Sequence, residues 1–361
     1  MAHVDDQRVA RVLDALEAQH PGAQLLVNDP WAIYYLTGFY ADMFERFCGV
    51  LLARDCEPVI MVNALHQLPE YDNARVAYHT DTDIVTDAIA SEIDPAKPLG
   101  IDTVMRSGYL MPLMERHAAS EFFLGDFAVT AARTYKDAAE QELMRVSSAA
   151  NDAVMADAIK LVHEGVTERE IADQMLGLYR KHGCEGFSFP PIVSFGANAG
   201  DPHHEPDDTV LKHGDVVLFD IGGRRRNYCS DMTRTVAVDH VTDEMRLVYD
   251  TVLNAQLAGI ACCKAGVSGR DVDAAGRRVI EAAGYGDAFG HGFGHGVGLE
   301  IHEAPTASPR GAAPLPAGSI VTAEPGIYLP GKFGVRIEDM LYVIEDGCID
   351  LTDAPKSLVI L

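Results

Sequence analysis

The hydrophobic positions in the first third of the chain alternate between helical and strand-like spacing. Val9, Leu13 and Leu16 recur at the interval of one helix face, which predicts an opening helix. Three short apolar runs follow, at 24–27, 50–53 and 59–62. Each run is bounded by Gly, Pro or Asp and is typical of a buried strand. Strands that alternate with helices predict an α/β layer for this part of the chain.

The pattern changes after a polar stretch at 131–137. Apolar residues spaced by three, four and seven then predict a long helix over about 138–163. Thr167 and Glu170 fit a capping box, which predicts a second helix ending near Gly183. Further helices are expected over about 243–264 and 269–283, and strands at 216–221, 231–238, 320–323 and 335–344. We therefore expect two domains, residues 1–132 and 133–361.

Composition and charge narrow the class of protein. The chain has 361 residues, of which 48% are hydrophobic, so it is long enough for two domains with cores. Its net charge of −25 argues against nucleic acid or an anionic membrane as a partner, because both bind a basic face. The seven cysteines are scattered, and no apolar run approaches the roughly 18 residues of a membrane span. These features predict a soluble cytoplasmic protein with reduced thiols.

Four acids and one histidine in the C-terminal part have the composition of a metal site. They are Asp220, Asp231, His295, Glu324 and Glu338. Oxygen ligands favour hard or borderline divalent ions over metals that prefer thiolates. We expect two divalent ions, manganese before cobalt or zinc, and two such ions can activate one water as a nucleophile.

The spacing of the two aspartates predicts a hairpin. The midpoint between Asp220 and Asp231 falls between Arg225 and Arg226, where we expect the turn. Residues directly opposed in an antiparallel pair have Cβ atoms roughly 4.5–5.5 Å apart, which would place the two carboxylates face to face.

The two glutamates follow the same geometry. The midpoint between Glu324 and Glu338 is Gly331, which Pro330 precedes. A Pro-Gly pair favours a turn, so a second carboxylate pair is predicted at the base of a second hairpin.

Histidines flanked by glycine accompany these acids. The stretch GHGFGHGVGLEIHE at 290–303 contains His291, His295 and His302. Its glycines let imidazoles and backbone approach a metal or a substrate closely. A second cluster, PHHEP at 202–206, contains His203 and reads as an exposed loop. We expect these histidines to act as ligands or as acid and base groups.

Together these motifs resemble the pita-bread metallopeptidases, in the prolidase and aminopeptidase P branch. The matching motifs are PHHEP at 202–206, DVVLFDIGG at 215–223, SDMTRT at 230–235, HGFGHGVGLEIHE at 291–303, TAEPGIY at 322–328 and VRIED at 335–339. WAIYYLTGF at 31–39 is similar to the creatinase-type N-terminal domain of that branch. The resemblance implies an α/β (α+β) protein, with a pita-bread catalytic domain and a smaller creatinase-like α/β domain before it.

The resemblance also implies a role for each metal-site residue. Asp220 would chelate one ion, and His295 and Glu324 the other. Asp231 and Glu338 would bridge the two ions. Glu324 would in addition carry the proton to the leaving nitrogen.

Further roles follow for the residues around the metals. His203 and His302 would stabilise the tetrahedral intermediate, and Arg336 would orient the bridging carboxylates or the substrate. His291 and Tyr328 would line the substrate pocket.

The expected activity is hydrolysis of the peptide bond before proline by a hydroxide that bridges the metals. An Xaa-Pro dipeptidase acting on Xaa-Pro dipeptides is the leading hypothesis, and an aminopeptidase P acting on longer peptides is the alternative. A catalytically silent binding protein, or a non-peptidase metal enzyme on the same fold, is the alternative from another class. The resemblance further suggests a homodimer.

Overall fold

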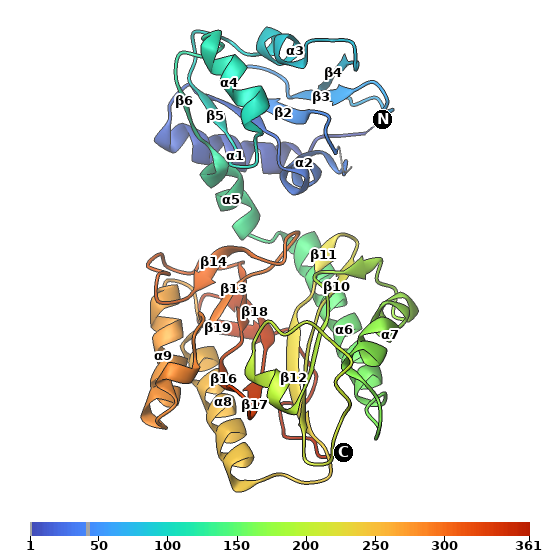
Figure 1. Cartoon of the computed structure of the whole chain (residues 1–361). Helices are drawn as coiled ribbons and strands as arrows, with labels where there is room; N and C mark the ends of the chain where they lie inside the picture. Colours follow the sequence, from blue (N-terminus) through green and yellow to red (C-terminus); the bar gives the residue numbers. More distant parts are fainter. Residues whose placement is uncertain (1, 41–43) are drawn as a thin grey trace. The chain divides into compact units, whose positions relative to one another are not determined.

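The computed structural model describes residues 2–40 and 44–361. They form two compact units that divide between Arg133 and Thr134, one residue beyond the position expected from the sequence. Figure 1 shows the first unit in blue to green and the second in green to red. Within the described residues, no helix combines the length and apolarity needed to cross a lipid bilayer.

The first unit is built on a mixed sheet with strand order β4-β3-β2-β1-β5-β6. Pairs β1–β5, β5–β6 and β3–β4 are parallel, and pairs β1–β2 and β2–β3 are antiparallel. The strands are β1 (Gln24–Val27), β2 (Cys48–Leu52), β3 (Val59–Asn63), β4 (Arg75–His79), β5 (Leu99–Ile101) and β6 (Phe122–Leu124). The three apolar runs expected as strands are thus confirmed as β1, β2 and β3, and all their residues are buried.

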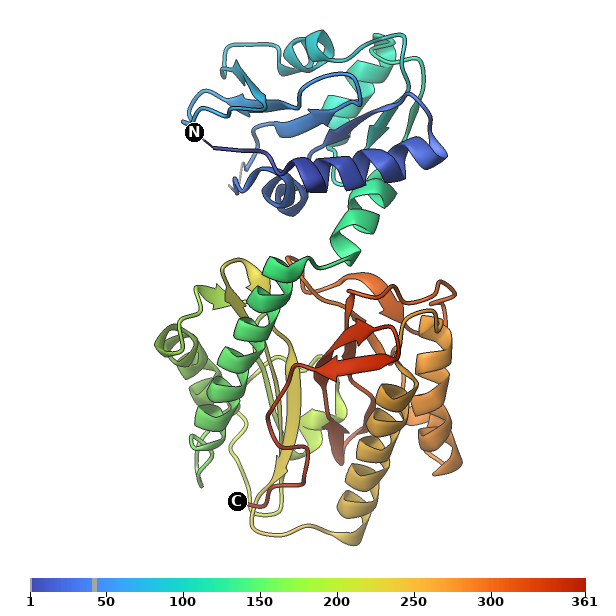
Figure 2. The same cartoon turned by 180° about the vertical axis from the view of Figure 1, so that it is seen from behind.

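Helices cover both faces of this sheet. They are α1 (Asp6–Gln19), α2 (Pro30–Thr37), α3 (Val85–Glu92), α4 (Ser107–Glu115) and α5 (Asp126–Thr134). Helices α3 and α4 lie on one side of the sheet and α1 and α2 on the other (Figures 1 and 2). Asp5 and Asp29 cap the first two helices, because their carboxylates accept hydrogen bonds from backbone N–H groups of the first turn.

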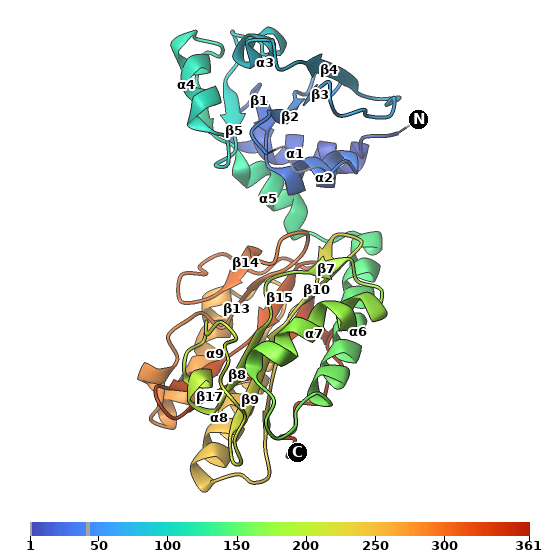
Figure 3. The same ribbon diagram turned by 45° about the vertical axis from the view of Figure 1, so that its right-hand side comes forward.

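The second unit places its strands between two pairs of helices. These are α6 (Ala138–Ile159), α7 (Glu168–Lys181), α8 (Asp243–Cys262) and α9 (Gly269–Ala282). Helices α6 and α7 flank the strands on one side, and α8 and α9 flank them on the other (Figures 1 and 3). The capping box predicted from Thr167 and Glu170 opens α7, with both reciprocal hydrogen bonds present. Helices α6 and α7 pack one apolar cluster against the strands, and α8 and α9 pack another.

The strands of this unit are short and form several small sheets. They are β7 (Gly186–Phe187), β8 (Ile192–Phe195), β9 (Val216–Ile221), β10 (Gly223–Arg225), β11 (Tyr228–Cys229), β12 (Met232–Ala237), β13 (Gly294–Gly296), β14 (Glu303–Ala307), β15 (Ile320–Ala323), β16 (Gly326–Leu329), β17 (Phe333–Arg336), β18 (Asp339–Ile344) and β19 (Gly347–Asp350). Their orders are β11-β10-β7, β12-β9-β8, β14-β13-β15-β18-β19 and β16-β17.

The hairpin that carries Asp220 and Asp231 has a different register from the one expected. Asp220 lies opposite Thr233 rather than opposite Asp231, because the turn falls at Arg226 and Asn227, one residue later than expected. Both turn residues have positive φ angles, 48° and 69°, as a tight two-residue hairpin turn requires. Asp231 is therefore two positions along the strand from the residue that faces Asp220, still on the same face.

The second hairpin confirms the expected register. Gly326 pairs with Arg336 in one ladder and Ala323 pairs with Asp339 in the next, so both ladders share Gly331 as their midpoint. Gly331 has a φ of 74° at the turn. The strand expected over 335–344 is wrong as a single element. It breaks at residues 337–338, because β17 pairs with β16 whereas β18 pairs with β15.

Candidate metal centre

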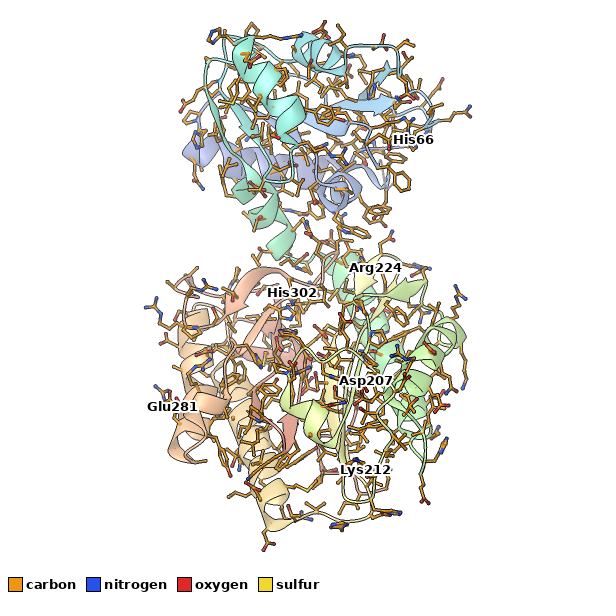
Figure 4. All side chains as sticks on the ribbon, in the orientation of Figure 1. His66, Asp207, Lys212, Arg224, Glu281 and His302 are labelled. Carbon is orange, nitrogen blue, oxygen red and sulfur yellow. The ribbon has the colours of Figure 1, made fainter. Side chains whose placement is uncertain are left out.

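One cavity in the second unit brings the expected site residues together. It has a volume of about 470 Å³. All five expected metal ligands line it, as do four of the other predicted site residues. The nine are Asp220, Asp231, His295, Glu324, Glu338, His203, His291, His302 and Arg336. His302 lies beside the β13–β14 strands of this unit (Figure 4).

The acids and the histidine reach this cavity from five separate places in the fold. Asp220 is in β9, Asp231 immediately precedes β12, and His295 is the central residue of β13. Glu324 follows β15, and Glu338 occupies the break between β17 and β18. That break, which the apolar pattern did not predict, turns the backbone N–H of Glu338 towards the carbonyl oxygen of Thr233, 3.1 Å away.

Three of these residues form a compact set of possible ligands. Ligand atoms of Asp231, His295 and Glu338 all lie within 4.8 Å of one another. His295 Nε2 is 3.2 Å from Glu324 Oε1 and 3.5 Å from Asp231 Oδ2. His295 Nδ1 is 3.0 Å from the carbonyl oxygen of Gly296, to which it donates. That bond leaves Nε2 facing the acids, the arrangement in which an imidazole binds a metal.

Asp220 supplies a further sign of a cation site. One carboxylate oxygen, Oδ2, accepts a hydrogen bond of 2.5 Å from Arg336. The other, Oδ1, is buried and has no hydrogen-bond partner among the described residues. A buried carboxylate oxygen without a partner costs free energy, and a divalent cation would relieve that cost. The residues therefore fit a metal centre.

The electrostatics of the acids point the same way. Burial raises the pKa of Asp231 well above its usual range, and the nearby charge of Glu338 raises it further. Burial and the charge of Glu324 likewise raise the pKa of Glu338. Burial is also the main cause of the raised pKa of Glu324. Several carboxylates in one buried place repel one another, so either protons or cations must accompany them.

Three histidines of the cavity favour their neutral form. Burial lowers the pKa of His291, His295 and His302. The rings of His295 and His302 meet edge to face, with centroids 4.3 Å apart. A neutral imidazole can bind a metal or donate a hydrogen bond to a developing negative charge. These histidines can therefore serve as metal ligands or as donors to a reaction intermediate.

The resemblance implies that Arg336 orients the bridging carboxylates or the substrate, and in the structure its direct partner among the acids is Asp220. Its guanidinium donates to Asp220 Oδ2, to Thr233 Oγ1 at 2.9 Å and to the Tyr328 hydroxyl at 2.6 Å. Thr233 Oγ1 donates in turn to Glu338 Oε2 at 2.7 Å. Arg336 thus holds Asp220 directly and Glu338 through Thr233.

Tyr328 lies behind the cavity and does not line it. Its hydroxyl is 2.8 Å from His291 Nε2 and accepts the hydrogen bond from Arg336. Burial raises the pKa of Tyr328 to about 12, so its hydroxyl keeps its proton and donates it to His291. His291 Nδ1 lies 2.8 Å from the carbonyl oxygen of Gly292. Both nitrogens of His291 are therefore engaged, and Tyr328 orients this ring rather than the substrate.

The cavity also contains polar residues that the motifs did not single out. Arg310, Thr306 and Ser308 contribute polar groups to its lining, beside an apolar part formed by Phe189 and Ile192. Thr306 is in β14, and the other two polar residues follow it in an irregular stretch. That stretch has no periodicity to place it near the metal centre, so the sequence held no signal for Arg310.

Comparison with known proteins places both units in described families. Residues 142–345 match the model of metallopeptidase family M24, and residues 8–123 match the creatinase/prolidase N-terminal domain. Together the two matches cover most of the chain and confirm the two-part fold class expected from the motifs.

Three similar proteins illustrate the relationship. YkvY of Bacillus subtilis strain 168, provisionally named a dipeptidase, is 33% identical over 98% of this chain and 99% of its own. An Xaa-Pro dipeptidase from Bacillus anthracis has a TM-score of 0.89 at 31% identity, with 98% and 99% of the two chains covered. A prolidase from Thermococcus sibiricus has a TM-score of 0.92 at 32% identity, with 98% of each chain covered. The chain therefore belongs to metallopeptidase family M24, in its prolidase branch.

Proposed function

We propose that the protein is a metal-dependent Xaa-Pro dipeptidase, which hydrolyses the peptide bond before proline. The observation that carries this proposal is the convergence on one cavity of four buried or half-buried carboxylates and of three histidines whose pKa is lowered by burial. The similar proteins named above as an Xaa-Pro dipeptidase and a prolidase support the same substrate class.

Two divalent ions would be held by Asp220, Asp231, His295, Glu324 and Glu338. Carboxylate oxygens in the majority favour manganese, with cobalt and zinc as alternatives. When bound, such a pair supplies an activated water and a positive charge that polarises the scissile carbonyl. The unpartnered Asp220 Oδ1 and the exposed lone pair of His295 Nε2 support this assignment.

The remaining site residues would act on the substrate. His203 and His302 line the cavity and would donate hydrogen bonds to the oxygen that becomes negative as the carbonyl is attacked. Glu324, whose pKa is raised by burial, would take a proton from water and pass it to the leaving nitrogen. His291 and Arg336 would keep the surrounding groups in place through Tyr328 and Asp220.

Arg310 supports the dipeptidase over the aminopeptidase P alternative. Its guanidinium is a cation in the lining of the same cavity. The free carboxylate of an Xaa-Pro dipeptide lies close to the scissile bond, whereas a longer peptide carries an uncharged amide there. A guanidinium binds a carboxylate through two parallel hydrogen bonds, so Arg310 would select the shorter substrate.

The test is an assay of Xaa-Pro dipeptides against Xaa-Pro-Xaa tripeptides and Xaa-Pro amides, after chelation and readdition of manganese, cobalt or zinc. We expect preferential cleavage of dipeptides, and a raised KM for dipeptides alone in Arg310→Met. Faster cleavage of tripeptides would support aminopeptidase P. Normal metal content without cleavage of any of these peptides would support a silent binding protein or a non-peptidase enzyme.

Four sequence-based expectations accompany this proposal and stay predictions. They are domains at 1–132 and 133–361, a homodimer, a cytoplasmic location, and the lack of nucleic-acid or membrane partners. Separate expression of 133–361 would test the domain boundary. Sedimentation of the full chain would test the dimer, and cell fractionation would test the location.

A further inference from the structure

A buried carboxylate outside the cavity organises the segment that carries His203. Glu168 is the first residue of α7, and its side chain is fully buried. Its Oε1 accepts hydrogen bonds from the Phe195 N–H at 2.6 Å and from Asn198 Nδ2 at 3.0 Å. These two donors lie where β8 ends and the following helical turn begins.

The second oxygen of Glu168 holds the other end of the same segment. Oε2 accepts from His204 Nε2 at 2.7 Å and from the Asp207 N–H at 3.1 Å. Arg169 adds a backbone bond, its N–H donating to the carbonyl oxygen of Asp207 at 3.0 Å. Asp207, labelled in Figure 4, thus marks the point where the segment is tied to the start of α7.

His203 lies between these two attachments. Its neighbours Pro202 and His204 have different environments, since Pro202 lines the metal cavity with His203 whereas His204 is turned to Glu168. The backbone N–H of His203 donates to Asp201 Oδ1 at 3.0 Å, and His203 lines the cavity. The adjacent histidines of the PHHEP motif therefore face two different partners.

We propose that Glu168 and His204 are positioning residues, which hold segment 196–207 so that His203 is presented to the metal cavity. The proposal rests on the role proposed above for His203. Four hydrogen bonds converge on one buried carboxylate, and they join residues on both sides of His203. Loss of the His204 bond would free the half of the segment nearest to His203.

A cation at this cluster is the competing explanation. Ligand atoms of Glu168, His204 and Asp207 lie within 4.8 Å of one another, as in a metal site. Each oxygen of Glu168 already accepts two hydrogen bonds, which fills its lone pairs. His204 Nε2 must carry a proton to donate to a carboxylate, so it has no lone pair for a metal either.

The main variants are His204→Ala, which removes the donor, and His204→Gln, whose amide nitrogen can replace Nε2 as a donor to Glu168. We expect kcat on an Xaa-Pro dipeptide to fall about 10- to 100-fold in His204→Ala, with recovery in His204→Gln. The matched control is His182→Ala at the other end of α7. His182 donates to Asp157 at 2.9 Å in a similar pair, and its loss should leave kcat unchanged.

A double-mutant cycle with His203→Ala separates positioning from a general loss of structure. If His204 acts through His203, His204→Ala should have almost no further effect on kcat in the His203→Ala background. An equal loss in both backgrounds would overturn the proposal. A lower metal content in His204→Ala than in the wild type would also overturn it, because the cluster would then hold a cation.

Hydrogen–deuterium exchange provides a readout that does not depend on activity. His204→Ala should speed exchange in segment 196–207, and His204→Gln should restore the protection. Unchanged exchange in His204→Ala would overturn the proposal that Glu168 and His204 hold this segment, even if kcat falls. If the wild type cleaves no Xaa-Pro peptide but the exchange result is as expected, the proposed function fails while the structural role of Glu168 and His204 stands.

Discussion

Two groups of buried charges lie on opposite sides of the same strands, and they differ in how their charges are balanced. Glu338 lines the metal cavity and accepts a hydrogen bond from Thr233, whereas their chain neighbours Asp339 and Arg234 pair with each other on the reverse side. On the reverse face Arg234 and Asp339 form an ion pair of 2.7 Å with both side chains almost fully buried. On the cavity face the acids outnumber the cations that contact them, and Arg336 is bonded to Asp220 alone among them.

On the reverse face the buried charges are balanced by partners of opposite sign. Asp339 Oδ2 accepts from Lys356 Nζ and from Gln256 Nε2, each at 2.6 Å. Arg234 donates to the carbonyl oxygens of Glu338, Ala354 and Pro355 as well as to Asp339. The comparison shows that burial alone does not mark a functional charge. Buried acids without enough cations do, because a missing positive charge has to come from outside the chain.

Removing the negative charge from the reverse face, where the buried charges are balanced, should have the largest effect on stability. In Asp339→Asn the charges of Arg234 and Lys356 lose their buried partner, so we expect the free energy of unfolding to fall by about 3–5 kcal/mol. Urea unfolding of the metal-loaded protein measures it. Asp350→Asn is the matched control, because Asp350 also bonds Lys356 but is partly exposed, and should cost about 1 kcal/mol or less. Similar losses in both variants would contradict the comparison.

Removing one acid from the cavity face, where the acids outnumber the cations, should lower activity but stabilise the metal-free protein. We expect Asp231→Asn to lower kcat/KM more than about 100-fold, since even residues that only support metal ligands cost 10- to 100-fold. The metal-free variant should nevertheless unfold at a higher temperature than the metal-free wild type, because the repulsion around Glu338 is reduced. Asp346→Asn, an exposed acid in the same unit, serves as control. Undiminished activity in Asp231→Asn would refute the proposed site.

Arg336→Lys should weaken metal binding in the cavity, with a smaller effect on activity than Asp231→Asn. A lysine keeps the charge but loses the three-way contact with Asp220, Thr233 and Tyr328. We expect metal affinity to drop about 10- to 100-fold, with activity largely recovered at saturating metal. Titration of the metal-free protein with manganese measures the affinity. Tyr328→Phe removes one of the three contacts and should show a smaller drop, so an equal or larger drop would contradict this account.

The smallest effect is a pH dependence of the metal-free protein. The folded-state pKa values of Asp231 and Glu338 are raised above their unfolded values. Their contribution to stability is thus full below the unfolded values, near 4, and is lost as the pH rises through the folded-state values. Between pH 5 and pH 8 metal-free protein should lose stability, and added manganese should restore more of it at pH 8. The same slope in Asp231→Asn would show that other groups cause it.

The candidate ligands could be named from local sequence, and their register only in part. The turn at Gly331 follows from Pro330 and from the freedom of glycine at positive φ, so the register of Glu324 and Glu338 could be derived by counting. The turn at Arg226 and Asn227 could not, because no glycine marks it and arginine rarely adopts a positive φ. The expected register of the aspartates was wrong by two positions for that reason.

Contacts between distant segments escaped prediction. Arg310 enters the cavity from an irregular stretch, Arg336 bonds to an acid 116 residues away, and Glu168 reaches His204 across 36 residues. Neither periodicity nor spacing records such pairings, since they depend on how the sheets and helices pack.

By itself the sequence determined the types and the order of the five candidate ligands, most of the strands that carry them and the turn at Gly331, because each depends on neighbours a few residues away. Only the tertiary structure decided which acids have a cationic partner. Glu338 and Asp339 are adjacent and chemically alike, yet one faces a cavity short of positive charge and the other an arginine and a lysine. Glu338 lies in the break before β18 and Asp339 begins that strand, so their side chains meet different partners, and the packing of distant segments gives each side its charge balance.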